Sequence, residues 1–176
     1  MTTPSKRALI VIDLQNDYFP GGAYPLWAAS ATLDRVAAAI QAATAQGVPV
    51  VLVQHVANSQ KGPAPFFNPA TEGVAIHPRV LTAAPDAPRV VKAFADGFLE
   101  TELESALARW GVEELLICGM MTQNCVTHTA ISKGAEKYRV AVLTDCCTTV
   151  DQMLHKIALN ALSTRVALVT AEQALG

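Results

Sequence analysis

Short apolar runs rich in β-branched residues alternate with segments of helical periodicity along this chain. The first run, residues 8–13, reads ALIVID and is apolar on both faces, as a buried parallel strand is. Similar runs predict further strands at 50–55, 89–92, 114–119, 138–145 and 165–170. The spacing of apolar residues predicts helices at 33–43, 103–110, 124–136 and 154–162. Thr101 and Glu104 are predicted to form a capping box at the start of the second helix.

Strands that alternate with helices indicate a parallel α/β sheet with right-handed crossovers. We therefore expect a three-layer α/β/α fold with a six-stranded, mainly parallel, Rossmann-like sheet. With 176 residues, no repeat and no linker, the chain is expected to form a single domain over residues 1–176. Six prolines between 63 and 88 predict an irregular segment from 56 to 89, and loops of this length are usually functional or mobile.

Charge and composition exclude several classes of protein. The net charge is −2 and there is no basic block, which argues against binding to nucleic acid or to an anionic membrane. No stretch approaches the roughly 20 apolar residues of a membrane span, and the run after MTTPSKR is too short for the core of a signal peptide. We therefore expect a cytoplasmic protein that acts on a small molecule, with four free cysteine thiols.

Chemically active side chains follow the ends of the predicted strands. Asp13 ends the first strand, His55 the second and Lys92 the third, and Cys125 follows the fourth. In parallel α/β sheets, ligands bind beyond the carboxyl ends of the strands. An acid, a base and a thiol are therefore expected at one edge of the sheet.

Each of these residues has a structural interpretation as well as a functional one, and both stay open. Asp13, buried behind five apolar residues, would need a partner charge, or it could cap a loop through backbone hydrogen bonds. Lys92 could be a solvated surface residue or could neutralise Asp13. The first turn of a helix favours a thiolate at Cys125, and the amides there could hold an oxyanion, but a buried structural cysteine is the alternative.

Three segments together resemble the isochorismatase-like cysteine hydrolase family, which includes nicotinamidases and carbamoylsarcosine amidohydrolases. They are VIDLQNDYF (11–19), VVKAFADGFLETEL (90–103) and ELLICGMMTQNCVTHTA (114–130), and the similarity runs from about residue 7 to 170. The resemblance implies a catalytic triad of Asp13, Lys92 and Cys125. It also implies a cis peptide bond between Met120 and Met121, with the backbone amides of Met121 and Cys125 forming the oxyanion hole.

Two departures from relatives refine this expectation. Nicotinamidases bind a metal through an aspartate and histidines just after the second strand, whereas this chain reads VQHVANSQ (53–60) there and lacks an Asp-x-His pair. We therefore predict no metal and no other cofactor. Relatives that hydrolyse the vinyl ether of isochorismate commonly lack the cysteine, so Cys125 favours acyl transfer.

The function predicted from these residues is cysteine-dependent hydrolysis of a C–N bond in a small amide or carbamoyl substrate, through a thioester. The alternatives are a vinyl-ether hydrolase of the isochorismatase type, and a non-catalytic or redox protein that binds a metabolite. Candidate substrate-binding residues, from their place beside the motifs, are Phe19, Trp27, His55, Phe66 and Gln123. Family relatives are often homo-oligomers, and exposed apolar residues in the 60–80 loop are predicted to support subunit contacts.

Overall fold

The computed structural model describes residues 6–176 and contains a six-stranded sheet in the order β3-β2-β1-β4-β5-β6, in which every neighbouring pair is parallel. The first five residues of the predicted domain lie outside the described part. The strands are β1 (Arg7–Ile12), β2 (Val50–His55), β3 (Arg89–Lys92), β4 (Glu114–Met120), β5 (Arg139–Thr148) and β6 (Ala167–Val169). All six predicted strands are confirmed, with ends that shift by a few residues.

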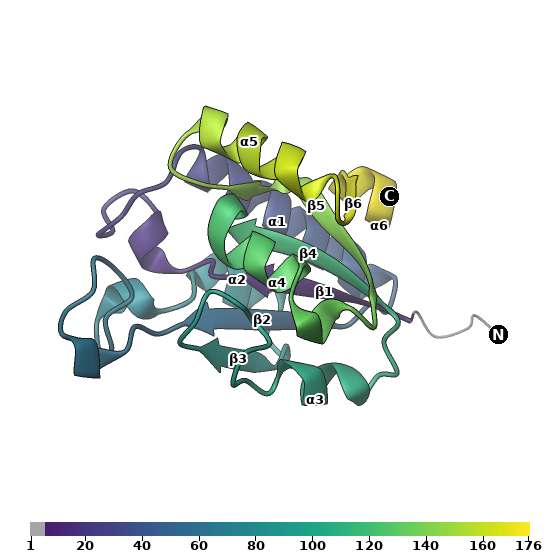
Figure 1. Cartoon of the computed structure of the whole chain (residues 1–176), viewed down its shortest axis with the longest axis horizontal. Coiled ribbons are helices and arrows are strands. Elements are labelled where there is room, and N and C mark those ends of the chain that lie inside the picture. The colour runs from purple at the N-terminus through teal and green to yellow at the C-terminus, as the bar shows by residue number, and fades with distance from the viewer. Residues whose placement is uncertain (1–5) are drawn as a thin grey trace.

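Helices cover both faces of the sheet (Figure 1), which confirms the three-layer architecture. α1 (Ala29–Ala45), α2 (Pro78–Ala83) and α6 (Ala171–Leu175) pack together on one face. On the other, α5 (Gln152–Leu162) and α4 (Thr127–Ala130) both pack against the π-helical turn η4 (Thr122–Val126). α3 (Leu103–Ala108) follows β3. In the described part of the chain, no helix combines the length and the apolar character that crossing a membrane requires.

Three details of the predicted helices are wrong. The helix predicted at 124–136 ends at Ala130, because Ser132 caps a separate 3-10 turn, η5 (Lys133–Ala135). The predicted capping box is absent: Glu102 is the N-cap of α3, and the hydroxyl of Thr101 donates to the carbonyl of Gly97. Helix α2 was not predicted within the proline-rich segment. Its proline stands at the first helical turn, where the missing N–H costs nothing.

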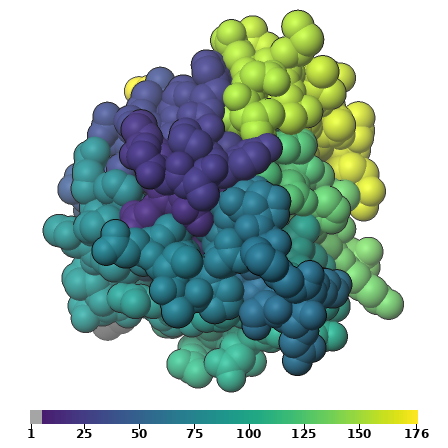
Figure 2. Space-filling view, turned by 90° about the vertical axis from the view of Figure 1, so that its left-hand side faces the viewer, coloured from purple at the N-terminus to yellow at the C-terminus, as the bar shows by residue number. Residues whose placement is uncertain are grey.

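The segments that follow β1 and β2 cover the carboxyl edge of the sheet. They contain the 3-10 turns η1 (Asn16–Tyr18), η2 (Ser59–Lys61) and η3 (Glu72–Val74), of which η1 and η3 pack against each other. Figure 2 views this side of the molecule, where the purple segment after β1 and the blue segment after β2 lie next to each other, with α5 in yellow-green above. The residues at the strand ends lie beneath these segments.

The large apolar side chains of the 60–80 loop do not form the exposed surface that was predicted for subunit contacts. Phe67, Ile76 and Val80 are buried, and Phe66 and Val74 are half-buried against the core. The aromatic rings pack inward on Tyr18 because the loop folds back over η1. Assembly into a homo-oligomer therefore stays a prediction without this support.

Close approach of two strands makes Gly119 sensitive to substitution. It lies in β4 with φ +124°, and a Cβ there would lie 2.0 Å from the carbonyl oxygen of Ile12, the last residue of β1. Gly119→Ala is expected to lower the free energy of unfolding by about 3–5 kcal/mol, because backbone strain adds to steric overlap. Gly111→Ala is the matched control, since Gly111 also has a positive φ (+59°) but open space around it. Urea denaturation should show a loss of about 1 kcal/mol in the free energy of unfolding for Gly111→Ala. An equal loss in the two variants would contradict the steric explanation.

Candidate active site

Asp13, Lys92 and Cys125 meet at the carboxyl edge of the sheet. Nζ of Lys92 lies 2.9 Å from Oδ2 of Asp13 and 3.1 Å from Sγ of Cys125. The side chains of Asp13 and Lys92 are 0% exposed. A buried charge of either sign is costly unless an opposite charge lies beside it, and here each charged group is the counter-charge of the other. We refer to these three residues as the Asp–Lys–Cys cluster.

Lys92 reaches Asp13 by crossing an intervening strand. β3 and β1 are separated by β2, which places their backbones about 10 Å apart. Lys92 is in register with His55, the last residue of β2, and its Nζ lies 2.9 Å from Nδ1 of that ring. Nζ also donates to the carbonyl of Phe94 at 3.1 Å. The extended lysine side chain therefore bridges the gap above the end of β2.

The carboxylate of Asp13 is paired by charge but not engaged by backbone amides. Asp13 has a left-handed φ of +54° immediately after β1, and neither of its oxygens has a hydrogen bond of good geometry within residues 6–176. Asp17 differs, since its carboxylate accepts from the amides of Ala23 at 3.1 Å and Phe67 at 2.7 Å. Asp17 therefore caps a loop through its side chain, the structural role that was the alternative for Asp13. Asp13 keeps lone pairs free to accept a proton.

Cys125 lies in the π-helical turn η4 and is 3% exposed. Burial raises the pKa of its thiol well above the ordinary value, the charge of Asp13 raises it further, and Lys92 opposes both. The upward direction follows from charge balance, because Asp13 already neutralises Lys92 and a thiolate would add an uncompensated buried charge. Burial therefore favours the neutral thiol over the thiolate that the helix position favours, and a neutral thiol loses its proton during attack.

His55 fixes the orientation of the cluster from the side of β2. Burial lowers the pKa of its ring, and the charge of Lys92 lowers it further against the opposing charge of Asp13. The neutral ring faces the ammonium with Nδ1, which must accept because an ammonium only donates. Its proton is therefore on Nε2.

Stability should fall as pH falls through the lowered pKa of His55. Because its pKa is lowered by folding, His55 binds fewer protons in the folded state than in the unfolded state. Its contribution to the free energy of unfolding is therefore complete above pH 6.5 and is lost as the pH falls below that value. Burial also lowers the pKa of His77 and His155 in the same direction. His55→Gln should flatten the decline in the urea midpoint below pH 6.5. His128→Gln, at an exposed ring, is the control. An unchanged decline in His55→Gln would refute this assignment.

Three atoms of types that bind metals surround the lysine. Oxygen, nitrogen and sulfur atoms of Asp13, His55 and Cys125 lie within 4.8 Å of one another. Nζ of Lys92 is within 3.1 Å of an atom of each, so the ammonium already supplies positive charge among them. A divalent ion there would be repelled by Lys92. This geometry supports the absence of a metal, which stays a prediction.

Gln15 and Asp17 attach the covering segments to the site, a role that the sequence did not assign. The side-chain amide of Gln15 donates to the carbonyls of His55 at 2.8 Å and Val74 at 2.7 Å, and its oxygen accepts from the amide of His55 at 2.8 Å. Together with Asp17, it fixes the end of β2 and the 66–74 segment. The available signal was the group of polar residues at 13, 15, 16 and 17 immediately after a buried strand.

The predicted substrate-binding residues fall in different places. His55 contacts the cluster directly. Phe19 packs on His77 with ring centroids 4.7 Å apart, and Phe66 packs on Tyr18 at 5.2 Å. Trp27, 40% exposed, lies 6.1 Å from the ring of His155.

Gln123 lies two residues before Cys125 in the sequence, and Tyr18 lies near the cluster in space. Nε2 of Gln123 lies 3.8 Å from Sδ of Met121, and the peptide bond between Met120 and Met121 is cis. Burial raises the pKa of Tyr18 far above its ordinary value, and the charges of Asp13 and Cys125 raise it further. Tyr18 therefore lies near both reactive groups and keeps its proton.

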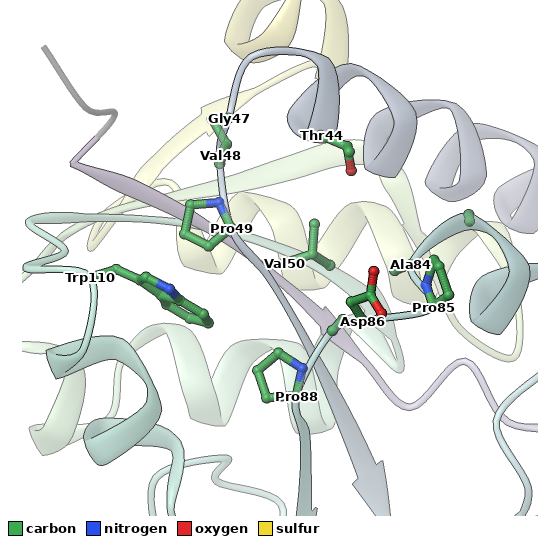
Figure 3. Close-up of a pocket in the computed structure, with 12 residues that line it drawn as sticks. Thr44, Gly47, Val48, Pro49, Val50, Ala84, Pro85, Asp86, Pro88 and Trp110 are labelled. Atoms are coloured by element: carbon green, nitrogen blue, oxygen red, sulfur yellow. The ribbon is translucent and has the colours of Figure 1, made fainter.

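A hollow of about 320 Å³ adjoins the cluster at His55 and Phe94, the two residues that bind Lys92 from the side of β2 and β3. A second hollow, of about 450 Å³, lies at the opposite, amino edge of the sheet (Figure 3), where Trp110, Pro49 and Pro88 face it. None of the residues that line it belongs to the Asp–Lys–Cys cluster. The hollow at the carboxyl edge is not lined by the cluster residues themselves either, but two of its lining residues, His55 and Phe94, contact Lys92.

The fold and the site define an α/β protein with a buried carboxylate, ammonium and thiol at the carboxyl edge of a parallel sheet. Comparison with known proteins makes this specific: residues 7–174 match the Isochorismatase domain model, and the chain belongs to the isochorismatase family of hydrolases. It is 37% identical over 142 residues to an isochorismatase family protein of Bacillus subtilis (strain 168), covering 81% of this chain and 77% of that one.

Two further comparisons agree with this assignment. The chain is 30% identical over 175 residues to the nicotinamidase of Escherichia coli (strain K12), covering 80% of this chain and 82% of that one. A crystal structure from Oleispira antarctica, of a protein assigned to the isochorismatase hydrolases, superposes with a TM-score of 0.87 at 32% identity over 99% of this chain and 98% of that chain.

Proposed function

We propose that this protein is a cysteine-dependent hydrolase that cleaves a C–N bond in a small amide or carbamoyl compound. The observation that carries the proposal is the position of one buried ammonium, 3.1 Å from the Cys125 sulfur and 2.9 Å from the Asp13 carboxylate. A nucleophile, a proton acceptor and a fixed positive charge within contact distance are the parts that acyl transfer through a thioester requires. The similarity to a nicotinamidase, named for amide hydrolysis, supports the same chemistry.

The first half of the reaction forms the thioester. Asp13 accepts the thiol proton as Sγ of Cys125 attacks the substrate carbonyl. Asp13 and Cys125 together therefore carry no more than one buried negative charge, which Lys92 balances. The backbone amides of Met121 and Cys125 bind the oxyanion of the tetrahedral intermediate. Asp13 then donates its proton to the leaving nitrogen, which departs as ammonia or an amine.

The second half restores the enzyme. Asp13, again a carboxylate, accepts a proton from water while the water oxygen attacks the thioester carbonyl. Collapse of the second tetrahedral intermediate breaks the C–S bond and releases the acid, and the proton returns from Asp13 to Sγ. Lys92 keeps the charge of Asp13 compensated in both halves and does not itself transfer a proton in this scheme.

No feature of the site favours the two other hypotheses. Vinyl-ether hydrolysis by general acid catalysis needs no thiol, whereas here the Cys125 sulfur lies 3.1 Å from the ammonium that also contacts Asp13. A redox protein would need a second thiol beside Cys125. Cys118, Cys146 and Cys147 are buried in strands β4 and β5 instead, each with a pKa raised first by its own burial.

The proposal is tested by measuring ammonia release from a panel of small amides, ureides and carbamoyl compounds. The wild-type protein should release ammonia from at least one compound, and Cys125→Ala, as the blank, should release none above background. Equal ammonia release by wild type and by Cys125→Ala from every compound of the panel would overturn the proposal.

A further inference from the structure

The first residue of the turn that carries Cys125 is hydrogen-bonded to a neighbouring helix. Oγ1 of Thr122 lies 2.9 Å from Nδ1 of His155, which belongs to α5. Thr122 is 0% exposed, so its end of this bond is shielded from water. No other side-chain hydrogen bond joins η4 to α5 within residues 6–176. In that part of the chain, the pair is therefore the one polar side-chain link between the turn and the helix.

The main-chain groups of η4 form local hydrogen bonds. The carbonyl of Met121 accepts from the amide of Asn124 at 3.0 Å. The carbonyl of Thr122 accepts from the hydroxyl of Thr127 at 2.6 Å. Local bonds set the shape of the turn but not its place relative to the sheet and the helices. The side chain of Thr122, in contrast, connects the turn to a separate helix of 11 residues.

His155 is held in place on two sides. Its amide donates to the carbonyl of Asp151 at 3.2 Å, and Asp151 caps α5 by accepting from the amide of Leu154 at 2.8 Å. On the other side, the ring centroid of Trp27 lies 6.1 Å from that of His155. The amide of Trp27 in turn donates to the carbonyl of Thr149 at 2.9 Å. The imidazole is therefore presented to the turn from an ordered position.

The half-buried ring of His155 has a single hydrogen-bond partner in the described residues. Burial lowers its pKa, so the ring is neutral at neutral pH. Its Nε2 has no partner among residues 6–176. A hydroxyl both donates and accepts, so Thr122 can bond either tautomer of the ring. Within the described chain, the ring nitrogens of His155 therefore bond to Thr122 alone.

Thr122 lies between the two amides that are proposed to bind the oxyanion. Met121 precedes it directly and Cys125 follows three residues later, so a shift of Thr122 moves both amides. Donors to an oxyanion act at about 2.7–3.1 Å, and a misplacement of about 1 Å can cost about a hundredfold in rate. The position of Thr122 is therefore expected to matter for the rate of acyl transfer.

We propose that His155 is a positioning residue, which holds η4 in place through its hydrogen bond to Thr122 so that both amides point at the oxyanion. This inference rests on the proposed function and adds a residue that touches neither the substrate nor the reacting atoms. Helix α5 thereby supports catalysis, although it carries no residue of the Asp–Lys–Cys cluster.

Two reactions of Cys125 separate the oxyanion from the thiol. In acylation by p-nitrophenyl acetate, Sγ attacks the ester carbonyl and the thiol proton passes to Asp13. The tetrahedral oxyanion then collapses to a thioester as the C–O bond breaks and p-nitrophenolate leaves. In alkylation by iodoacetamide, Sγ displaces iodide from a saturated carbon and no oxyanion forms. The ratio of the two rates therefore measures stabilisation of the oxyanion separately from thiol reactivity, with Cys125→Ala as the blank for both reactions.

His155→Phe and Thr122→Val each remove one side of the bond while keeping the approximate shape of the side chain. Both should slow acylation by about ten- to a hundredfold and leave alkylation within about twofold of wild type. The double variant should be no slower than the slower single variant, because the two residues act through one bond. His155→Asn, whose amide can replace Nδ1, and Thr122→Ser should keep most of the acylation rate. Thr164→Val, which removes a 2.9 Å hydroxyl bond to Ala161 at the exposed far end of α5, is the matched control and should change neither rate.

The outcomes distinguish this inference from the proposed function. Wild type that is not acylated beyond the blank would reject acyl transfer at Cys125, and the inference with it. Wild type that is acylated, with an unchanged ratio of rates in His155→Phe and Thr122→Val, would overturn the inference alone. Acylation and alkylation that change together would also overturn it, because His155 would then support only the fold or the thiol. With any compound that the ammonia-release panel identifies, the loss in these variants should fall on kcat rather than on KM.

Discussion

Cys125→Ala is expected to abolish C–N bond hydrolysis, with a loss of about 10⁴-fold or more in kcat. In the proposed mechanism the sulfur forms the thioester, and no other cysteine lies beside Asp13 and Lys92 within the described residues. The loss should appear in kcat rather than in substrate binding, because removing Sγ leaves the hollow and the ammonium in place. Ammonia release under saturating substrate, together with calorimetric binding, measures the two effects separately.

Cys118→Ala is the matched control for this variant. Cys118 is also a buried cysteine, but it lies within strand β4 and does not contact the cluster. It should lose stability as any small cavity mutant does, by about 1 kcal/mol, while keeping turnover. Turnover that survives in Cys125→Ala would instead support acid-catalysed cleavage of an ether, the reaction in which the thiol is dispensable.

Lys92→Met is expected to lower the free energy of unfolding by about 3–5 kcal/mol near neutral pH and to abolish turnover. Methionine is close to lysine in length and fills the same space, so the main effect is the loss of the charge that compensates buried Asp13. Urea denaturation near neutral pH measures the loss of stability.

The double variant Asp13→Asn/Lys92→Met distinguishes charge from packing. It removes both members of the buried pair while keeping their shapes, and replacing a whole pair is often neutral or stabilising. Most of the stability lost in Lys92→Met should therefore return, although turnover should not, because asparagine cannot accept the thiol proton. A double variant as unstable as the single one would show that lysine stabilises the fold through its other contacts, with His55 and Phe94.

The architecture of this chain was predictable because each strand carries its own signal. Residues 8–13 and 50–55 are short, β-branched and bounded by turn residues, and alternation with helical periods leaves few topologies. The same rule placed Asp13, Lys92 and Cys125 at one edge, since parallel strands end on the same side. The proline-rich segment was less predictable, because a proline at a helix start and one in a loop look alike in sequence.

The details of the site depend on three-dimensional distances that a sequence does not contain. Whether Lys92 reaches Asp13 depends on the register of β3 against His55 and on a side chain that crosses β2. The helix position of Cys125 favours a thiolate, whereas its burial raises the pKa of the thiol, and the degree of burial could not be read from the sequence. The roles of Gln15 and Asp17 appear only when the segments that they hold are seen folded over them.

Lys92, on which the proposed chemistry depends, belongs to the edge strand of the sheet. β3 has four residues and pairs only with β2, so its outer side lacks the support of a neighbouring strand. Edge segments of this kind fray by local opening well before a domain unfolds as a whole. Warming or mild denaturant should therefore abolish turnover while the spectroscopic signature of the protein is still native. The amide hydrogens of 89–92 should also exchange with solvent faster than those of β1.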